Sequence, residues 1–181
     1  DKYGCFDKEG KLVTPVESEE IKEYHGGMAR IRLMGRYGFM DKTGNIVVAP
    51  FSDEVENFSE DFVLVTIKDK LGFVTFSGDW IVVPMYDDGS SFSGGLAYLS
   101  YKGKYGYVDT SGEFVIPMKY DGATDFNIEY GLACVSQKGK WGVINRKGEV
   151  VVPIRYDEVI IAADGYIRVQ SGDKFGIYSK E

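Results

Sequence analysis

The chain has 181 residues and a formal net charge of -7, from 21 Lys and Arg against 28 Asp and Glu. This balance lacks the excess of cations that neutralises phosphates, so it excludes non-specific binding to nucleic acid or to an anionic membrane. The apolar share of 44% excludes a disordered chain, and no apolar run is long enough to cross a bilayer. One His and two Cys leave little material for a metal site or a histidine-based triad.

A short motif recurs along the chain at nearly constant spacing. An aromatic residue or Leu precedes a Gly six times, and successive glycines lie 34, 34, 34, 36 and 34 residues apart. These glycines are Gly4, Gly38, Gly72, Gly106, Gly142 and Gly176. We therefore predict one domain over residues 1–181, built from tandem repeats. The predicted repeats are residues 3–36, 37–70, 71–104, 105–140 and 141–174, with a partial sixth at 175–181.

The strands follow in chain order from alternating apolar and polar residues. The N-terminal fragment contains an aromatic-Gly strand and a strand near Pro15, joined by a turn from Asp7 to Gly10. After this fragment, each aromatic-Gly strand is preceded by one more strand, typified by residues 96–101, and is followed by a short strand beside Pro. The C-terminal fragment supplies only the preceding strand and the aromatic-Gly strand. We call these the first, second and third strands. Since Pro cannot donate a backbone hydrogen bond, we expect it to end the third strand or to lie on an edge.

A three-stranded antiparallel meander of about 34 residues is too small to bury a core alone, so neighbouring repeats must cover each other's apolar faces. No helix caps and no sustained 3.6-residue periodicity occur. We therefore predict an all-β protein whose repeats form an open, curved stack, with a five-bladed propeller-like ring as the alternative. The two extra residues of the fourth repeat are expected near Asn127 to Tyr130.

Residues that recur at one position of the repeat are interpreted as scaffold. The aromatic residue before each Gly is expected to pack in the core or between repeats. A carboxylate that recurs nine residues after the second Gly of each repeat is expected to accept backbone N–H bonds. This series is Glu19, Asp53, Asp87, Asp121 and Asp157. A calcium ladder is the alternative, but no Asp-rich loop has calcium-binding spacing. Cys5 and Cys134 are expected to be separate thiols.

Residues that differ between repeats are the candidates for binding. One face of the first strands varies from repeat to repeat, so it is either a solvated exterior or a recognition surface. Its members are Arg30, Leu64, Tyr98, Cys134 and Arg168. Arg30, Arg32 and Arg36 lie close together in an acidic chain and are predicted to anchor an acidic partner. Trp80 replaces smaller apolar residues or Phe at its position, as an enlarged core residue or a binding residue. The candidate binding residues are thus Arg30, Arg32, Arg36, Tyr98, Arg168 and Trp80.

The segment from Lys140 to Gly148, followed by Val152-Pro153 and Tyr156-Asp157, resembles the unit of the WG-repeat family, bacterial β-repeat proteins also described as KWG or WG-containing. The resemblance covers essentially the whole chain, although only Trp141 is a Trp at the motif position. It implies an interaction module, frequently on exported or cell-envelope proteins. It implies no common enzymatic activity.

We therefore expect a non-enzymatic binding module that recognises a protein partner. No catalytic residue, metal or cofactor is predicted, and neither nucleic-acid binding nor membrane insertion is expected. Carbohydrate binding is the alternative, because the chain contains 13 Tyr, 11 Phe and 2 Trp. That alternative requires exposed, roughly parallel aromatic rings, whereas a hydrolase would require polar side chains that converge in one pocket.

Overall fold

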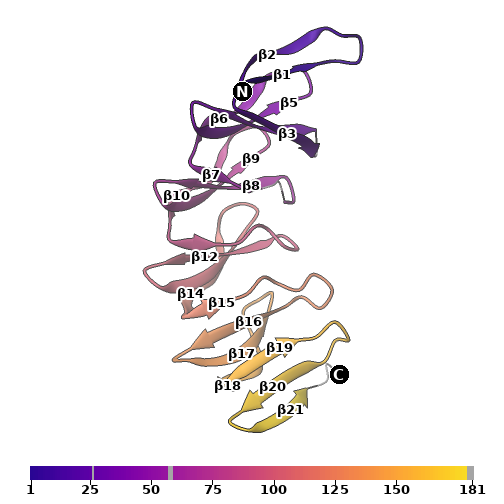
Figure 1. The fold of residues 1–181 in the computed structure, drawn as a ribbon. Helices are drawn as coiled ribbons and strands as arrows, with labels where there is room; N and C mark the ends of the chain where they lie inside the picture. Colours follow the sequence, from indigo (N-terminus) through magenta and orange to yellow (C-terminus); the bar gives the residue numbers. More distant parts are fainter. Residues whose placement is uncertain (26, 57–58, 179–181) are drawn as a thin grey trace. The chain divides into compact units, whose positions relative to one another are not determined.

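The computed structural model describes residues 1–25, 27–56 and 59–178, which form strands and turns (Figure 1). Chain contacts divide the protein into two compact units, residues 1–85 and 86–181. The prediction of an all-β protein made of tandem antiparallel repeats is confirmed in both units. In the described ranges no helix is long and apolar enough to cross a membrane. The open stack and the ring both stay predictions.

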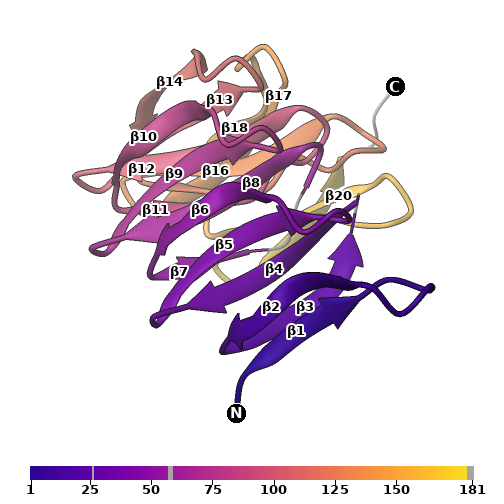
Figure 2. The same cartoon turned by 90° about the horizontal axis from the view of Figure 1, so that it is seen from above.

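The first unit contains a two-stranded sheet followed by two four-stranded sheets. The N-terminal sheet pairs β1 (Tyr3–Phe6) with β2 (Leu12–Ser18), as predicted for a fragment with only second and third strands. The next sheet has the order β3-β4-β5-β6, and Figure 2 shows β4 and β5 side by side. The third has the order β10-β9-β8-β7. These strands are β3 (Glu20–His25), β4 (Met28–Leu33), β5 (Arg36–Asp41), β6 (Ile46–Ser52), β7 (Glu54–Val55), β8 (Phe62–Ile67), β9 (Lys70–Thr75) and β10 (Trp80–Tyr86).

The second unit contains two four-stranded sheets and a three-stranded C-terminal sheet. Their strand orders are β11-β12-β13-β14, β15-β16-β17-β18 and β19-β20-β21. The strands are β11 (Asp88–Gly89), β12 (Leu96–Tyr101), β13 (Lys104–Asp109), β14 (Phe114–Tyr120), β15 (Gly122–Ala123), β16 (Leu132–Gln137), β17 (Lys140–Asn145), β18 (Val150–Tyr156), β19 (Glu158–Ile161), β20 (Ile167–Ser171) and β21 (Lys174–Tyr178). The C-terminal sheet has a first and a second strand, as predicted, and no third strand within the described residues.

Second and third strands are joined by tight turns whose chemistry is local. In the repeat that contains β5 and β6, the Asp41 carboxylate accepts the backbone N–H groups of Thr43 and Asn45 at 2.8 and 3.0 Å. Gly44 donates its own N–H to the Asp41 carbonyl at 3.1 Å and adopts a φ of +87°. Only Gly adopts such a conformation without strain, which explains the second recurring glycine.

The glycine of the aromatic-Gly motif is required by a close approach of the third strand. A Cβ at Gly106 would lie 2.6 Å from the carbonyl oxygen of Ile116 and 2.8 Å from the backbone nitrogen of Met118. The pairing of β13 with β14 shifts register on both sides of Tyr107, as in a β-bulge. A Cβ at Gly38, Gly72 or Gly142 would likewise lie 2.4 to 2.6 Å from the carbonyl oxygen of the facing third strand.

The third strands are longer than predicted, but their Pro lies on an edge, which was one of the two expected placements. Pro does not end the strand, because β14 runs for seven residues with Pro117 in its interior. The strand tolerates Pro because it lies at the outer edge of its sheet and pairs irregularly. An additional strand that was not predicted pairs with each first strand, as β11 does with β12. In three sheets it has only two residues, too few to show a periodicity, whereas β3 has six and β19 has four.

Consecutive sheets within a unit share one core. In the second unit, Leu96, Tyr107 and Ile116 of one sheet pack against Val135 and Ile144 of the next. These side chains are 5% exposed or less. The repeats therefore cover each other's apolar faces, as the length of one repeat required.

The variable face of the first strands is not the predicted exterior. Leu64 is 3% exposed and Cys134 is 6% exposed, while Arg30 and Tyr98 are half-buried. Among these five positions only Arg168, in the C-terminal sheet, is exposed. Within the second unit, the variable face of one sheet packs against the next sheet, as Cys134 does against Val159 and Val169.

The insertion in the fourth repeat lies where it was predicted. In the repeat before it, Ser93 pairs with Leu96 across a tight turn, whereas Asn127 pairs with Leu132. The two extra residues therefore fall between Asn127 and Leu132. Surface turns accept such insertions because neither sheet register nor core packing changes.

Candidate functional site

The recurring carboxylates hold the turns that join the first and second strands. Asp121 accepts the backbone N–H of Lys138 at 2.6 Å, and Asp157 accepts that of Gly172 at 2.8 Å. The remaining pairs are Gly35 to Glu19 at 2.9 Å, Lys68 to Asp53 at 2.7 Å and Lys102 to Asp87 at 2.6 Å. The prediction that these carboxylates accept backbone N–H bonds is confirmed, but the turn lies 15 to 17 residues further along the chain.

A cation seventeen residues before the carboxylate completes this framework. Asp121 forms an ion pair with Lys104, and Asp157 forms one with Lys140. The ion pair with Lys104 lowers the pKa of Asp121, and the turn N–H of Lys138 adds to the effect. Sequence reasoning missed this cation, although its signal was present: a Lys or Arg precedes the aromatic residue or Leu in all six motifs.

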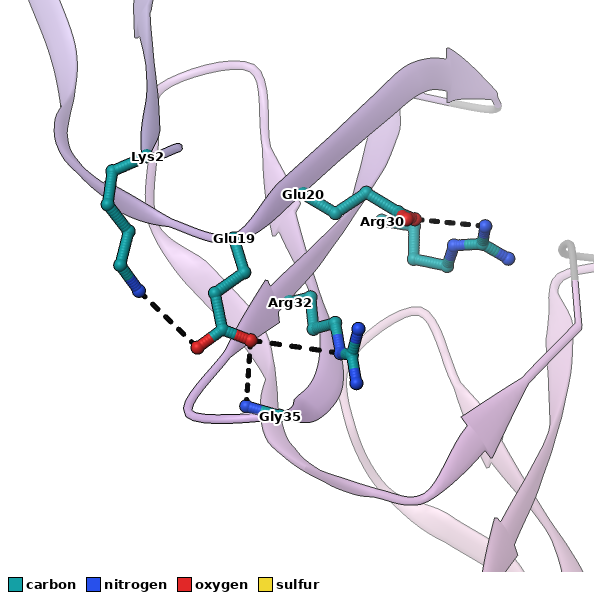
Figure 3. Close-up of polar contacts among 6 residues, drawn as sticks. All are labelled: Lys2, Glu19, Glu20, Arg30, Arg32 and Gly35. Atoms are coloured by element: carbon teal, nitrogen blue, oxygen red, sulfur yellow. Dashed lines mark hydrogen bonds and ion pairs between the residues drawn. The ribbon is translucent and has the colours of Figure 1, made fainter.

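The N-terminal copy of the framework contains two of the predicted arginines (Figure 3). Glu19 accepts the N–H of Gly35 and forms ion pairs with Lys2 at 3.3 Å and with Arg32 at 3.8 Å. The N–H of Gly35, followed by Lys2 and Arg32, lowers the pKa of Glu19. Arg30 is not part of this group and forms a separate ion pair with Glu20 at 3.1 Å, which Figure 3 also shows.

The arginines predicted to anchor an acidic partner therefore hold carboxylates of the chain itself. Arg30 and Arg32 also lie over the Tyr37 ring, at 5.4 and 5.2 Å from its centroid. Arg36 forms an ion pair with Asp53 and occupies the framework position of Lys104 and Lys140. The structure brings Arg30 and Arg32 together around one ring, and both are partly enclosed.

The other predicted binding residues lie in separate places. Tyr98 packs against Tyr105 and Tyr107, with ring centroids 5.8 and 6.5 Å away. Arg168 is exposed and forms an ion pair with Asp164 at 3.3 Å.

Trp80 is 39% exposed, and its ring lies 5.4 Å from that of Phe51 at an angle of 35°. It is therefore a surface side chain on the third strand β10 rather than an enlarged core residue.

The framework of cation, carboxylate and turn borders a groove between consecutive repeats. The described part of the chain contains two such grooves. The first groove, in the first unit, has a volume of about 670 Å³. It is lined by Lys2, Glu17, Leu33, Met34, Arg36 and Pro50. A second groove of about 550 Å³ lies in the second unit, and we call it the basic groove. It is lined by Lys104, Lys119, Asp121, Gln137, Lys138, Lys140, Ile154 and Arg155.

The two grooves occupy the same positions of the repeat. Corresponding residues are 102 positions apart before the insertion and 104 after it. The framework cations therefore correspond, Lys2 to Lys104 and Arg36 to Lys140. The remaining lining differs in charge and polarity: Glu17 corresponds to Lys119, Leu33 to Gln137, Met34 to Lys138 and Pro50 to Ile154. One backbone frame thus presents two different surfaces.

The residue before the motif Gly is half-buried in each of the four-stranded sheets. These residues are the aromatic Tyr37, Tyr105 and Trp141, and Leu71. Trp141 packs beside the core that contains Cys134 and Val159, which confirms the prediction of packing between repeats. In the C-terminal sheet the corresponding Phe175 is 79% exposed.

Throughout the described ranges, no three His, Cys, Asp or Glu side chains gather as metal ligands.

A model of the WG containing repeat matches residues 3–36, 37–70, 72–105, 105–141 and 141–175. The chain therefore belongs to the family of proteins with this repeat. No curated protein matches it in sequence.

Among solved structures, the chain is similar to a eukaryotic initiation factor at 12% identity, over 91% of this chain and 52% of that one, with a TM-score of 0.54. It is also similar to Hsv2 of Kluyveromyces lactis, at 11% identity, over 88% and 59% of the two chains, with a TM-score of 0.49. A third similarity is to the extracellular domain of BT4673 from B. thetaiotaomicron, at 13% identity, over 98% and 29%, with a TM-score of 0.40. The chain covers less than two thirds of each of these proteins, and the likeness concerns the fold alone.

Proposed function

We propose that this member of the WG containing repeat family is a non-enzymatic module that binds a protein partner through the grooves between its repeats. One observation carries the proposal: two grooves share a framework of cation, carboxylate and turn but differ in their remaining side chains. A binding scaffold has this organisation, because a rigid frame positions loops and side chains that are free to vary.

The chemistry of the grooves supports binding rather than catalysis. General acid–base catalysis is most efficient with a group whose pKa lies near the working pH. Among the described residues, Asp121 is the only carboxylate that lines the basic groove, and its pKa is held below the ordinary value by Lys104 and the turn N–H. The described lining residues of both grooves include no His, Cys or Ser.

A protein partner has more support than a carbohydrate. Sugar recognition needs exposed and roughly parallel rings, but the motif aromatics of the four-stranded sheets are half-buried. Trp80 is exposed, yet it is tilted by 35° from Phe51. The first groove combines the apolar Leu33 and Met34 with charged side chains, a mixture typical of protein interfaces.

Capture of a partner by the full chain tests the proposal. We expect the wild-type chain to be cross-linked reproducibly to a discrete protein, and the yield to fall at least fivefold with Met34→Asp in the first groove or Lys119→Glu in the basic groove. Met34 is 94% exposed, so this change leaves the core intact. Lys42→Glu, at an exposed turn outside both grooves, makes the same charge change as Lys119→Glu, so it is the control and should keep the wild-type yield. A yield that is unchanged in both groove variants would refute the proposal.

A further inference from the structure

The basic groove concentrates positive charge in an acidic protein. Its lining contains four lysines and one arginine against a single carboxylate, whereas the chain as a whole has a net charge of -7. Such a cluster creates a local positive potential that attracts an anionic ligand despite the net charge.

The framework occupies only part of this charge. Lys104 forms an ion pair with Asp121, and Lys140 forms one with Asp157. Three cations remain: Lys119, Lys138 and Arg155. Across the described residues none of these three forms an ion pair of its own, although Lys138 lies near enough to help lower the pKa of Asp121.

Two of the remaining cations are held in place by aromatic rings. The Lys119 ammonium lies 5.2 Å from the centroid of the Tyr120 ring. The Arg155 guanidinium lies 5.3 Å from that of Tyr156 and donates a hydrogen bond to the Tyr156 hydroxyl at 3.1 Å. A cation that already lies over a ring loses less side-chain freedom when a ligand binds.

The scaffold does not need these cations. The position of Lys119 and Arg155 is filled by Phe51 and Met85 in other repeats, and by Glu17 in the first groove. The corresponding carboxylates still accept their turn N–H groups there, for example Asp53 from Lys68. The extra charge of the basic groove is therefore an addition to a frame that forms without it.

We infer that the basic groove binds an acidic segment of a protein partner through carboxylates that contact Lys119, Lys138 and Arg155. This inference rests on the proposed function and names the chemistry of its ligand. Carboxylates are favoured over phosphate because the groove frame already binds two of them, Asp121 and Asp157, with lysines. Four of the five cations are lysines, which act as separate point charges and suit carboxylates spaced along a peptide.

Binding of fluorescein-labelled hexaglutamate to the full chain, followed by fluorescence anisotropy, tests the inference. We expect the double variant Lys119→Gln/Arg155→Gln to bind about three- to tenfold more weakly than the wild type. The control is Lys42→Gln/Lys147→Gln, which removes the same charge at exposed turns and should bind as the wild type does. Raising the salt from about 20 mM to about 200 mM should weaken wild-type binding, and labelled hexaglutamine should not bind.

Three outcomes would overturn the inference. The first is no hexaglutamate binding by the wild type, and the second is equal loss in the groove variant and the control. The third is tighter binding of inorganic pyrophosphate than of hexaglutamate, which would make the site a phosphate site. If a partner is captured through Met34 but hexaglutamate does not bind, the inference fails while the proposed function stands. If hexaglutamate binds but no partner is captured, the proposed function fails while the anion site stands.

Discussion

Replacing Gly106 with Ala should destabilise the second unit strongly. The added Cβ would lie 2.6 Å from the carbonyl oxygen of Ile116, 2.8 Å from the nitrogen of Met118 and 3.0 Å from the carbonyl carbon of Pro117. All three are backbone atoms of β14, so no side chain can rotate away, and the strand itself must shift. We expect a loss of about 3 kcal/mol in the free energy of unfolding. For a chain of this size the melting temperature should fall by about 6 to 12 °C.

The C-terminal sheet supplies a matched control. Gly176 occupies the same motif position in β21, but its sheet has no third strand within the described residues. A Cβ there would meet only the Cγ2 atom of Val169, at 3.2 Å. Gly176→Ala should therefore cost less than about 1 kcal/mol. Urea denaturation followed by circular dichroism measures both variants. Equal losses, or a loss below about 0.5 kcal/mol for Gly106→Ala, would refute the role assigned to the third strand.

Three further predictions concern stability and reactivity. The pKa of Asp121 is lowered below its ordinary value of 3.8, so the unfolded chain binds protons more readily than the folded chain. The free energy of unfolding should therefore fall as the pH drops below about 4. A free energy that stays constant down to about pH 3 in urea titrations would contradict this. Tyr107→Phe should cost about 1 to 2 kcal/mol in the same assay, because the buried hydroxyl donates to the Thr124 carbonyl at 2.7 Å; an unchanged midpoint would count against that bond. Burial raises the pKa of Cys134 to about 11, so Ellman's reagent should modify the half-buried Cys5 first and Cys134 only after denaturation. Equally fast reaction of both thiols in the native chain would be inconsistent with this burial.

The hairpins could be predicted because their determinants are local. An Asp that opens a turn and a Gly that closes it, as in Asp41 and Gly44, fix the connection within four residues. Which face of each first strand is buried against a neighbouring sheet could not be predicted in this way. Leu64 and Cys134 belong to a face that varies between repeats, and variation suggested an exterior. Both are buried nevertheless, and Cys134 packs against Val159 and Val169 of the next sheet, so a position can vary between repeats and still belong to the core.

The candidate site was predicted only in part. Arg36 was grouped with Arg30 and Arg32 because they are close in sequence, yet its position holds a cation in every motif, and it pairs with Asp53. A comparison of repeats by position would have identified it as part of the framework. The grooves were not predictable from one repeat, because they combine third-strand side chains such as Lys119 with a turn residue such as Lys138, nineteen residues later.

Transfer of the basic lining to the first groove tests the central claim most directly. The double variant Glu17→Lys/Met34→Lys places cations at the positions that correspond to Lys119 and Lys138, and both native side chains are exposed. Calorimetric titration with hexaglutamate should then show a second peptide bound per chain, since the frame is common and the lining decides the ligand. Unchanged stoichiometry in a variant that keeps the wild-type circular dichroism and unfolding midpoint would contradict the account.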